Sequence, residues 1–267
     1  MRGSVERHEV AVAGGGVFCE VAGAGPAVVL SHDGLLHREG FDELFADLAA
    51  EHRVARWDRR GYGRSARAGA AYDSAEDLAA VVRSVTDGPA VLVGCSLGAL
   101  VTLACALDHP ELAAALVLVG PVVTGHDLSE HFITRGGHHP PPPGAPVAEV
   151  IDYYSDVDPW FVAPANVEAR RRLRALLAAN PHNAEPKALD SLLAQPPLAA
   201  RLPEIAVPTL VVVGEDDIAD VHAHSGVIEA AVPGARRVVV RGSGHSVPLE
   251  VPEAFTATVR EFLAGLR

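Results

Sequence analysis

The chain of 267 residues is poor in several residue types that mark particular classes of protein. It has one lysine, Lys187, one methionine, and three cysteines, Cys19, Cys95 and Cys105. The cysteines are too few for a disulfide framework, and their spacing matches no zinc-binding pattern. We therefore expect a reduced protein that folds around a hydrophobic core rather than around disulfides or a metal.

Long apolar runs and a basic surface are missing as well. No run approaches the roughly 20 apolar residues that span a bilayer, and the N-terminal stretch lacks the apolar segment of a secretory signal. The formal net charge is −12, with 34 acidic against 22 basic residues. Such a chain does not favour nucleic acid or an anionic membrane as a partner, because both require a positive face. These absences predict a globular, cytoplasmic protein.

Hydrophobic residues make up 49% of the chain and follow two alternating periodicities. Apolar runs typical of strands cover residues 8–12, 17–21, 27–31, 54–57, 90–93, 116–120, 209–214 and 237–240. Helical spacing covers residues 41–48, 74–85, 99–108, 224–231 and 252–263. Strands that alternate with helices predict an α/β fold, with a mostly parallel central sheet flanked by helices.

One interval breaks the alternation. Between Val122 and Pro208 the sequence shows no strand pattern. Short helical patterns lie at 147–154, 167–177 and 188–193. The interval leaves the sheet at the C-terminal end of a strand, which is the edge where open α/β sheets bind ligands. We therefore expect a core made of residues 1–122 and 207–267, with a helical lid inserted as residues 123–206.

The segment Gly94-Cys95-Ser96-Leu97-Gly98 joins a strand to a helix. A serine between two glycines at such a junction is typical of a nucleophile elbow. The turn is so tight that the serine takes strained dihedral angles, and the positions two residues away must lack a Cβ atom. The hydroxyl then stands clear of the sheet at a helix N-terminus, where backbone N–H groups favour negative charge. Ser96 is therefore the candidate nucleophile.

A nucleophilic serine needs a base to take its proton and a carboxylate to orient that base. His245 lies in a loop of small residues after the last predicted strand, and Asp217 follows the strand before it. The chain order Ser96, Asp217, His245 is the order expected for this triad on an α/β sheet. Asp216 is the alternative acid if the loop is shifted by one residue.

Together with several flanking motifs, these residues make the chain resemble the α/β-hydrolase superfamily over nearly its full length. The motifs are Asp-Arg-Arg-Gly-Tyr-Gly-Arg-Ser at 58–65, Asp-His-Pro-Glu at 108–111, Gly-Glu-Asp-Asp at 214–217, and Gly-His at 244–245 with Pro-Glu at 252–253. In length and lid the chain is most similar to small lactone hydrolases, esterases, cofactor-free haloperoxidases and C–C bond hydrolases. The resemblance implies an α/β-hydrolase fold and a triad that requires neither a metal nor an organic cofactor.

The resemblance also implies an oxyanion hole built from two backbone N–H groups. One belongs to Leu97, the residue after the nucleophile. The other comes from a loop that usually reads His-Gly-x, and this chain has His32-Asp33-Gly34-Leu35 at that place. The second donor is then Gly34, and Asp33 replaces the usual glycine. Asp33 would bring a carboxylate near the site, where it could orient a polar substrate or act on water.

Several of the few aromatic residues gather in the expected lid, namely Phe132, Tyr153, Tyr154, Trp160 and Phe161. They predict an apolar substrate pocket, and they would also pack the lid helices against the core. The candidate substrate-binding residues are Asp33, Leu35, Cys95, Tyr153, Trp160 and Phe161. We expect the partner to be a small molecule with an apolar portion.

The predicted activity is hydrolysis of a carboxylic ester or lactone through an acyl-enzyme intermediate. A serine rather than an aspartate at the elbow argues against haloalkane dehalogenase or epoxide hydrolase chemistry. Cleavage of a C–C bond in a vinylogous diketone, or perhydrolysis, would use the same residues. A non-hydrolytic role, as a lyase, a cyclase or a ligand receptor, also stays open, because fold and triad do not determine the substrate.

Overall fold

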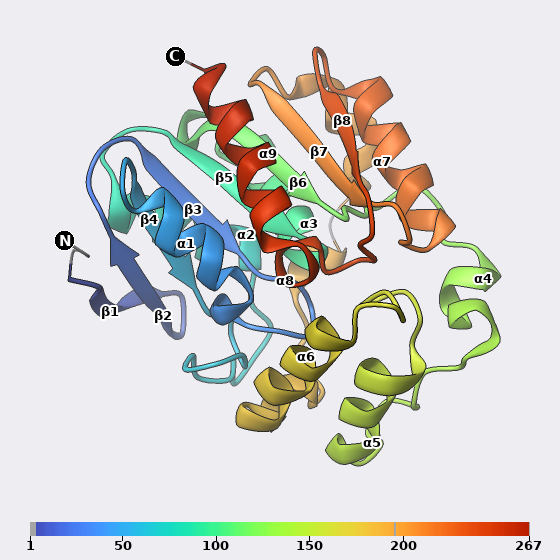
Figure 1. Ribbon diagram of the computed structural model, residues 1–267. Coiled ribbons are helices and arrows are strands. Elements are labelled where there is room, and N and C mark those ends of the chain that lie inside the picture. The colour runs from blue at the N-terminus through green and yellow to red at the C-terminus, as the bar shows by residue number, and fades with distance from the viewer. Residues whose placement is uncertain (1–3, 195, 267) are drawn as a thin grey trace.

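The structure is a computed structural model and describes residues 4–194 and 196–266. Its centre is an eight-stranded sheet with the strand order β1-β2-β4-β3-β5-β6-β7-β8 (Figure 1). The strands are β1 (Glu6–Val12), β2 (Gly15–Ala22), β3 (Ala27–Ser31), β4 (Arg53–Trp57), β5 (Ala90–Cys95), β6 (Ala113–Val119), β7 (Thr209–Gly214) and β8 (Arg236–Val240). β2 is antiparallel to both of its neighbours, and all other pairs are parallel. This confirms the predicted α/β fold with a mostly parallel sheet.

Helices cover both faces of this sheet because consecutive strand residues point into two different cores. The core helices are α1 (Asp42–Leu48), α2 (Ser74–Val85), α3 (Leu97–Asp108), α7 (Ala219–Ala231), α8 (Val247–Glu250) and α9 (Pro252–Ala264). Val29 and Leu92 pack on the side of α2 and α3, whereas Leu30 and Val93 pack on the side of α1 and α9 (Figure 1). No helix among the described residues has the length and hydrophobicity needed to cross a bilayer.

The parallel arrangement gathers the loops that matter at one edge of the sheet. β3, β5, β6, β7 and β8 are consecutive neighbours that run in the same direction. The loops at their C-terminal ends therefore lie next to one another. Ser96 follows β5, Asp217 lies in the loop after β7, and His245 lies in the loop after β8.

Residues 120–208 connect β6 to β7 and add no strand to the sheet within the part that the structure describes. Their helices are α4 (Glu130–Ile133), α5 (Val147–Asp152) and α6 (Val167–Ala179), with a π-helical turn at Tyr153–Val157. The helix expected at 188–193 is reduced to one 3₁₀ turn, Ser191–Ala194. Figure 1 shows α4, α5 and α6 beyond the arrowheads of the parallel strands. A separate apolar cluster, which includes Leu35, Ile151 and Leu173, joins α5 and α6 to the loop after β3.

Candidate active site

Ser96 occupies the turn between β5 and α3 with a positive φ of 53° and a ψ of −117°. A Cβ atom on Gly94 would lie 2.3 Å from the carbonyl oxygen of Gly98, and one on Gly98 would lie 2.2 Å from the carbonyl oxygen of Ser31. Both clashes are with backbone, so only glycine fits at these two positions. α3 begins at Leu97. The N–H groups of Ala99 and Leu100 donate to the Ser96 carbonyl oxygen at 2.8 and 3.2 Å, whereas those of Leu97 and Gly98 have no partner among the described residues. The backbone has the geometry of a nucleophile elbow.

His245 and Asp217 form a buried hydrogen-bonded pair. His245 Nδ1 lies 2.7 Å from Asp217 Oδ2, and the N–H of Ile218 donates to Asp217 Oδ1 at 2.7 Å. Burial lowers the pKa of His245, but the charge and the hydrogen bond of Asp217 outweigh it and raise the pKa above its ordinary value of 6.5. Because Nδ1 donates to the carboxylate, Nε2 of the neutral ring is left free to accept a proton.

The loops after β7 and β8 meet so closely that the choice of acid is determined by geometry. A Cβ atom on Gly214 would lie 1.9 Å from the carbonyl oxygen of Gly244. Asp216, the alternative acid, is exposed, and its N–H donates to the carbonyl oxygen of Ser243 at 2.9 Å. The structure thus places Asp217 rather than Asp216 against His245.

The loop after β3 is fixed by His32. The N–H of Arg59 donates to His32 Nε2 at 2.9 Å, so Nδ1 carries the ring proton and donates to the carbonyl oxygen of Asp33 at 2.7 Å. Burial and the charge of Arg59 lower the pKa of His32 well below 6.5. His32 is therefore a neutral ring that supports the loop.

The Asp33 side chain turns into its own loop. Its Oδ1 accepts hydrogen bonds from the N–H groups of Leu35 and Leu36, both at 2.7 Å. These bonds occupy the N–H of Leu35 and leave the N–H of Gly34 without a partner among the described residues. A Cβ atom on Gly34 would lie 3.7 Å from the Leu97 side chain, so the two candidate donor residues are neighbours.

A cavity of about 370 Å³ lies above these loops, and we name it the catalytic cavity. Ser96 and His245 both line it, together with Gly34 and Leu35. The remaining lining comes from the inserted segment: Leu128, Phe132, Ile133, Arg135, Pro140, Tyr154 and Phe161. Neither here nor elsewhere among the described residues do three His, Cys, Asp or Glu side chains form a group that could hold a metal ion.

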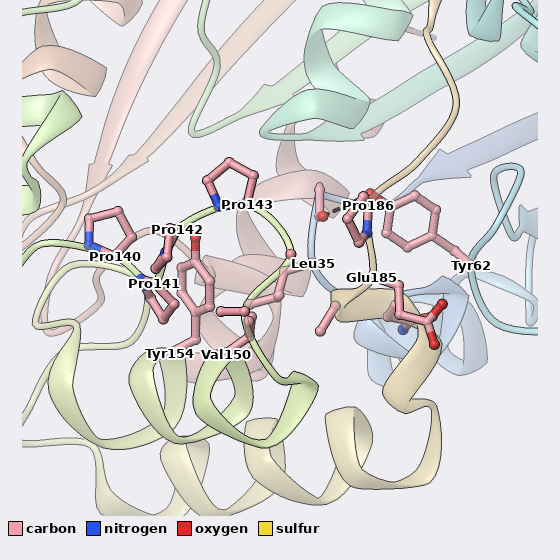
Figure 2. A pocket seen from close by; sticks show the side chains of 15 residues that line it. Leu35, Tyr62, Pro140, Pro141, Pro142, Pro143, Val150, Tyr154, Glu185 and Pro186 are labelled. Atoms are coloured by element: carbon pink, nitrogen blue, oxygen red, sulfur yellow. Dashed lines mark hydrogen bonds between the residues drawn. The ribbon is translucent and has the colours of Figure 1, made fainter.

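A second cavity of about 280 Å³ adjoins the first, and we name it the proline cavity. Gly34, Leu35, Pro140 and Tyr154 line both cavities. Figure 2 shows the prolines at 140–143 on one side and Tyr62, Glu185 and Pro186 on the other. Proline has no N–H group, so the proline side of this cavity presents apolar rings rather than hydrogen-bond donors.

Two of the candidate substrate-binding side chains, Leu35 and Phe161, line the catalytic cavity. Four others, Asp33, Cys95, Tyr153 and Trp160, line neither the catalytic cavity nor the proline cavity.

Cys95 is buried with the sheet residues that face α1 and α9, and burial raises the pKa of its thiol well above 9.0. Cys95 is thus a packed apolar group beneath the elbow.

Trp160 contributes its backbone rather than its ring. The carbonyl oxygens of Trp160 and Phe161 accept the N–H groups of His245 at 2.8 Å and of Ser246 at 2.9 Å. The buried Asp158 in turn accepts the N–H groups of Trp160 and Phe161 at 2.7 and 2.8 Å. The inserted segment therefore holds the histidine loop through main-chain hydrogen bonds, which the aromatic pattern in the sequence does not reveal.

Sequence reasoning misses four lining residues: Leu128, Ile133, Arg135 and Pro140. For Arg135 the sequence does contain a signal, the run Arg135-Gly136-Gly137, which is typical of a turn. All three residues have a positive φ, of 50°, 63° and 91°. Two glycines after an arginine suit such a turn, but the pattern does not say that the turn borders a cavity.

Known proteins share both the sequence pattern and the fold. A model of the Alpha/beta hydrolase family matches residues 28–258. The chain is 31% identical over 260 residues to the polyketide synthase ThaQ of Burkholderia thailandensis, a match that covers 93% of this chain but 12% of that protein. It is 32% identical over 241 residues to RutD of Klebsiella pneumoniae, a carbamate hydrolase by name, with 83% of this chain and 85% of that protein covered.

A solved structure of an esterase from Thermogutta terrifontis superposes with a TM-score of 0.78 at 25% identity, covering 98% of this chain and 99% of that chain. The family match spans most of the sheet, the elbow and the loops that carry Asp217 and His245. The chain therefore belongs to the alpha/beta hydrolase family, and it is a hydrolase.

Proposed function

We propose that this protein is a serine hydrolase that cleaves a carboxylic ester or lactone through an acyl-enzyme intermediate. Ser96 is the nucleophile, His245 the base and Asp217 the orienting acid. One observation carries the proposal: the buried Asp217–His245 pair and the strained Ser96 open onto the same cavity. Strain of this kind persists where function requires it.

The reaction begins at the Ser96 hydroxyl. His245 Nε2 takes its proton as Oγ attacks the substrate carbonyl, and Asp217 stabilises the imidazolium that forms. His245 then passes the proton to the leaving oxygen, which departs and leaves the acyl group on Ser96. A water molecule, deprotonated by His245, attacks the acyl-enzyme and releases the acid. Each proton taken up by His245 is returned, so the cycle consumes only substrate and water.

The negative charge of the tetrahedral intermediate needs two donors. We assign them to the N–H groups of Leu97 and Gly34. The N–H of Leu97 lies at the start of α3, where helix geometry leaves it unbonded. Asp33 supports the second donor indirectly, because it holds the N–H groups of the two residues after Gly34. Such preorganised donors commonly contribute on the order of 10²–10³ in rate each.

We assign the role of a lid to residues 123–206. Support comes from the catalytic cavity, whose lining includes Phe132, Ile133 and Phe161 from this segment. Apolar side chains there favour a substrate with an apolar portion. The proline cavity adjoins the catalytic cavity at Leu35 and Tyr154, so a long substrate can extend into it.

Two of the similar proteins are named an esterase and a carbamate hydrolase, and both names describe cleavage at a carbonyl bonded to a heteroatom. The direct test is product analysis with ethyl esters, lactones and a vinylogous diketone. We expect ester or lactone hydrolysis by the wild-type protein, and a fall in kcat on the order of 10⁴–10⁶ in Ser96→Ala. Cleavage of the diketone alone, or an active Ser96→Ala protein, would overturn the proposal.

A further inference from the structure

Arg135 is the one strongly basic side chain among the described residues that line the catalytic cavity. Apart from His245, the lining holds no other group that is charged near neutral pH. Leu128, Phe132 and Ile133 contribute apolar lining, and Cζ of Arg135 lies 5.7 Å from the centroid of the Phe132 ring. Arg135 is paired with the buried Asp158, so only the part of its guanidinium that Asp158 does not engage is free to attract an anion in the cavity.

Only part of the guanidinium is used inside the protein. Arg135 Nε donates to Asp158 Oδ2 at 2.6 Å, and Nη2 donates to Asp158 Oδ1 at 2.9 Å. The third nitrogen, Nη1, has no hydrogen-bond partner among the described residues, and it is not one of the fully buried polar atoms without a partner. Nη1 therefore keeps some solvent exposure in a residue that lines the catalytic cavity, and its two N–H groups are the ones that Asp158 leaves unused.

Asp158 positions Arg135 without using all of the positive charge. Its carboxylate is fully buried and also accepts the N–H groups of Trp160 and Phe161. Burial raises the pKa of Asp158, but the hydrogen bonds and the charge of Arg135 outweigh it and lower the pKa below 3.8. The negative charge is thus shared among four donors. Two parallel hydrogen bonds fix the plane of the guanidinium, so Nη1 is held in a defined direction.

The backbone at Arg135 is strained as well. Its φ of 50° is uncommon for a residue with a side chain. The turn continues through Gly136, where a Cβ atom would lie 3.1 Å from the His131 ring and 3.3 Å from the Trp160 ring. Strain at a cavity wall is kept where it places a side chain for a purpose.

From these observations we infer that Arg135 binds an anionic group of the substrate, so that the preferred substrate is an ester or lactone that also carries a carboxylate. Nη1 donates a charge-assisted hydrogen bond to that carboxylate while the ester carbonyl lies at Ser96. The part of this inference that concerns ester cleavage rests on the proposed function, whereas the binding of the anion by Arg135 does not.

The test compares substrates that differ by one terminal group. Ethyl pentanoate is paired with monoethyl glutarate, and ethyl hexanoate with monoethyl adipate. We expect the wild-type protein to favour at least one charged ester by about 10- to 100-fold in kcat/KM, the range that a hydrogen bond to a charged group contributes. Arg135→Gln should lower this ratio by the same factor. The matched control is Arg171→Gln, an exposed arginine of α6 paired only with Glu168 among the described residues, which should leave the ratio unchanged.

Removing Arg135 leaves Asp158 buried without its cation, which can destabilise the protein. The double variant Arg135→Gln with Asp158→Asn removes both charges, and its asparagine keeps the shape of the Asp158 side chain. It should fold, as judged by near-ultraviolet circular dichroism, and should show the same loss of preference. A charged-to-neutral ratio in either folded variant that equals the wild-type ratio would overturn the inference.

A binding measurement separates this inference from the proposed reaction. Adipic acid monoanilide and hexananilide are amide analogues of the adipate pair, and titration calorimetry measures their binding without any need for turnover. Tighter binding of the charged anilide to wild type, lost in Arg135→Gln, supports the role of Arg135 even if no ester is cleaved. Equal binding of the two anilides to wild type would overturn it, even if esters are cleaved.

Discussion

His245 Nδ1 lies 2.7 Å from Asp217 Oδ2, in a pair that is buried between the loops after β7 and β8. The two loops approach so closely there that Gly214 and Gly244 are in backbone contact. The pair is therefore positioned by main-chain packing as well as by its own hydrogen bond. His245 lines the catalytic cavity together with Ser96.

This pair predicts different effects for two neighbouring aspartates. Asp217→Asn should lower kcat by about 10⁴, because the amide cannot hold the imidazole in the required tautomer or stabilise its positive charge. Asp216→Asn is the matched control, and its kcat should stay within about threefold, since Asp216 is exposed and contributes only its N–H to the loop. A larger loss in Asp216→Asn than in Asp217→Asn would show that the acid is wrongly assigned.

The pH dependence follows from the His245 pKa. The ring must be neutral to act as a base, so kcat/KM should fall as the pH drops through the His245 pKa. Asp217 raises that pKa above 6.5, and the midpoint of the acidic limb should therefore lie above 6.5. In Asp217→Asn the midpoint should move to lower pH, because burial then acts without the carboxylate. The check is kcat/KM for ethyl hexanoate from about pH 5 to about pH 9; an unchanged midpoint in the variant would contradict it.

Two variants of Asp33 distinguish a role in holding its loop from a direct role of its carboxylate in the reaction. Asp33→Asn keeps an oxygen that can accept the N–H groups of Leu35 and Leu36, so kcat/KM should stay within about tenfold of wild type. Asp33→Ala leaves both N–H groups unpaired and loosens the loop of Gly34, which should lower kcat by up to about 10². If the carboxylate itself acted on water or substrate, the asparagine variant would lose as much activity as the alanine variant.

The elbow predicts a stability effect at Gly98. A Cβ atom there would lie 2.2 Å from the Ser31 carbonyl oxygen, so Gly98→Ala should lower the free energy of unfolding by at least about 2 kcal/mol. Gly69 is the matched control, because a Cβ atom on it meets nothing within 4 Å and its φ is not positive. Urea unfolding measures both variants, and equal stability of the two would contradict the proposed crowding.

The elbow, the triad candidates and the parallel sheet could be predicted because each leaves a short-range signal. A buried strand appears as an apolar run, and Gly94 and Gly98 mark the turn around Ser96. The role of Asp33 could not be predicted, because its two hydrogen bonds depend on how one loop closes on itself. Trp160 likewise acts through its backbone carbonyl, whose partner, the N–H of His245, is far away in the sequence.

The role of Arg135, in the inserted segment, could not be predicted from the sequence either. Its partner Asp158 is 23 residues away, and nothing in the spacing of the two indicates a buried pair. Short helices and loops without a regular hydrophobic period carry little information about which side chains face a cavity. Tertiary packing decides that, and the four lining residues missed by the sequence all come from this segment.

The most direct measurement is covalent labelling of Ser96. A fluorophosphonate reacts with a serine whose hydroxyl is activated by a base, and the intact mass and peptide mapping then give the number and position of the labels. We predict one label, on Ser96, that is absent from Ser96→Ala and strongly slowed in His245→Ala. A well-folded wild-type protein that takes up no label, or a label on another residue, would contradict the account.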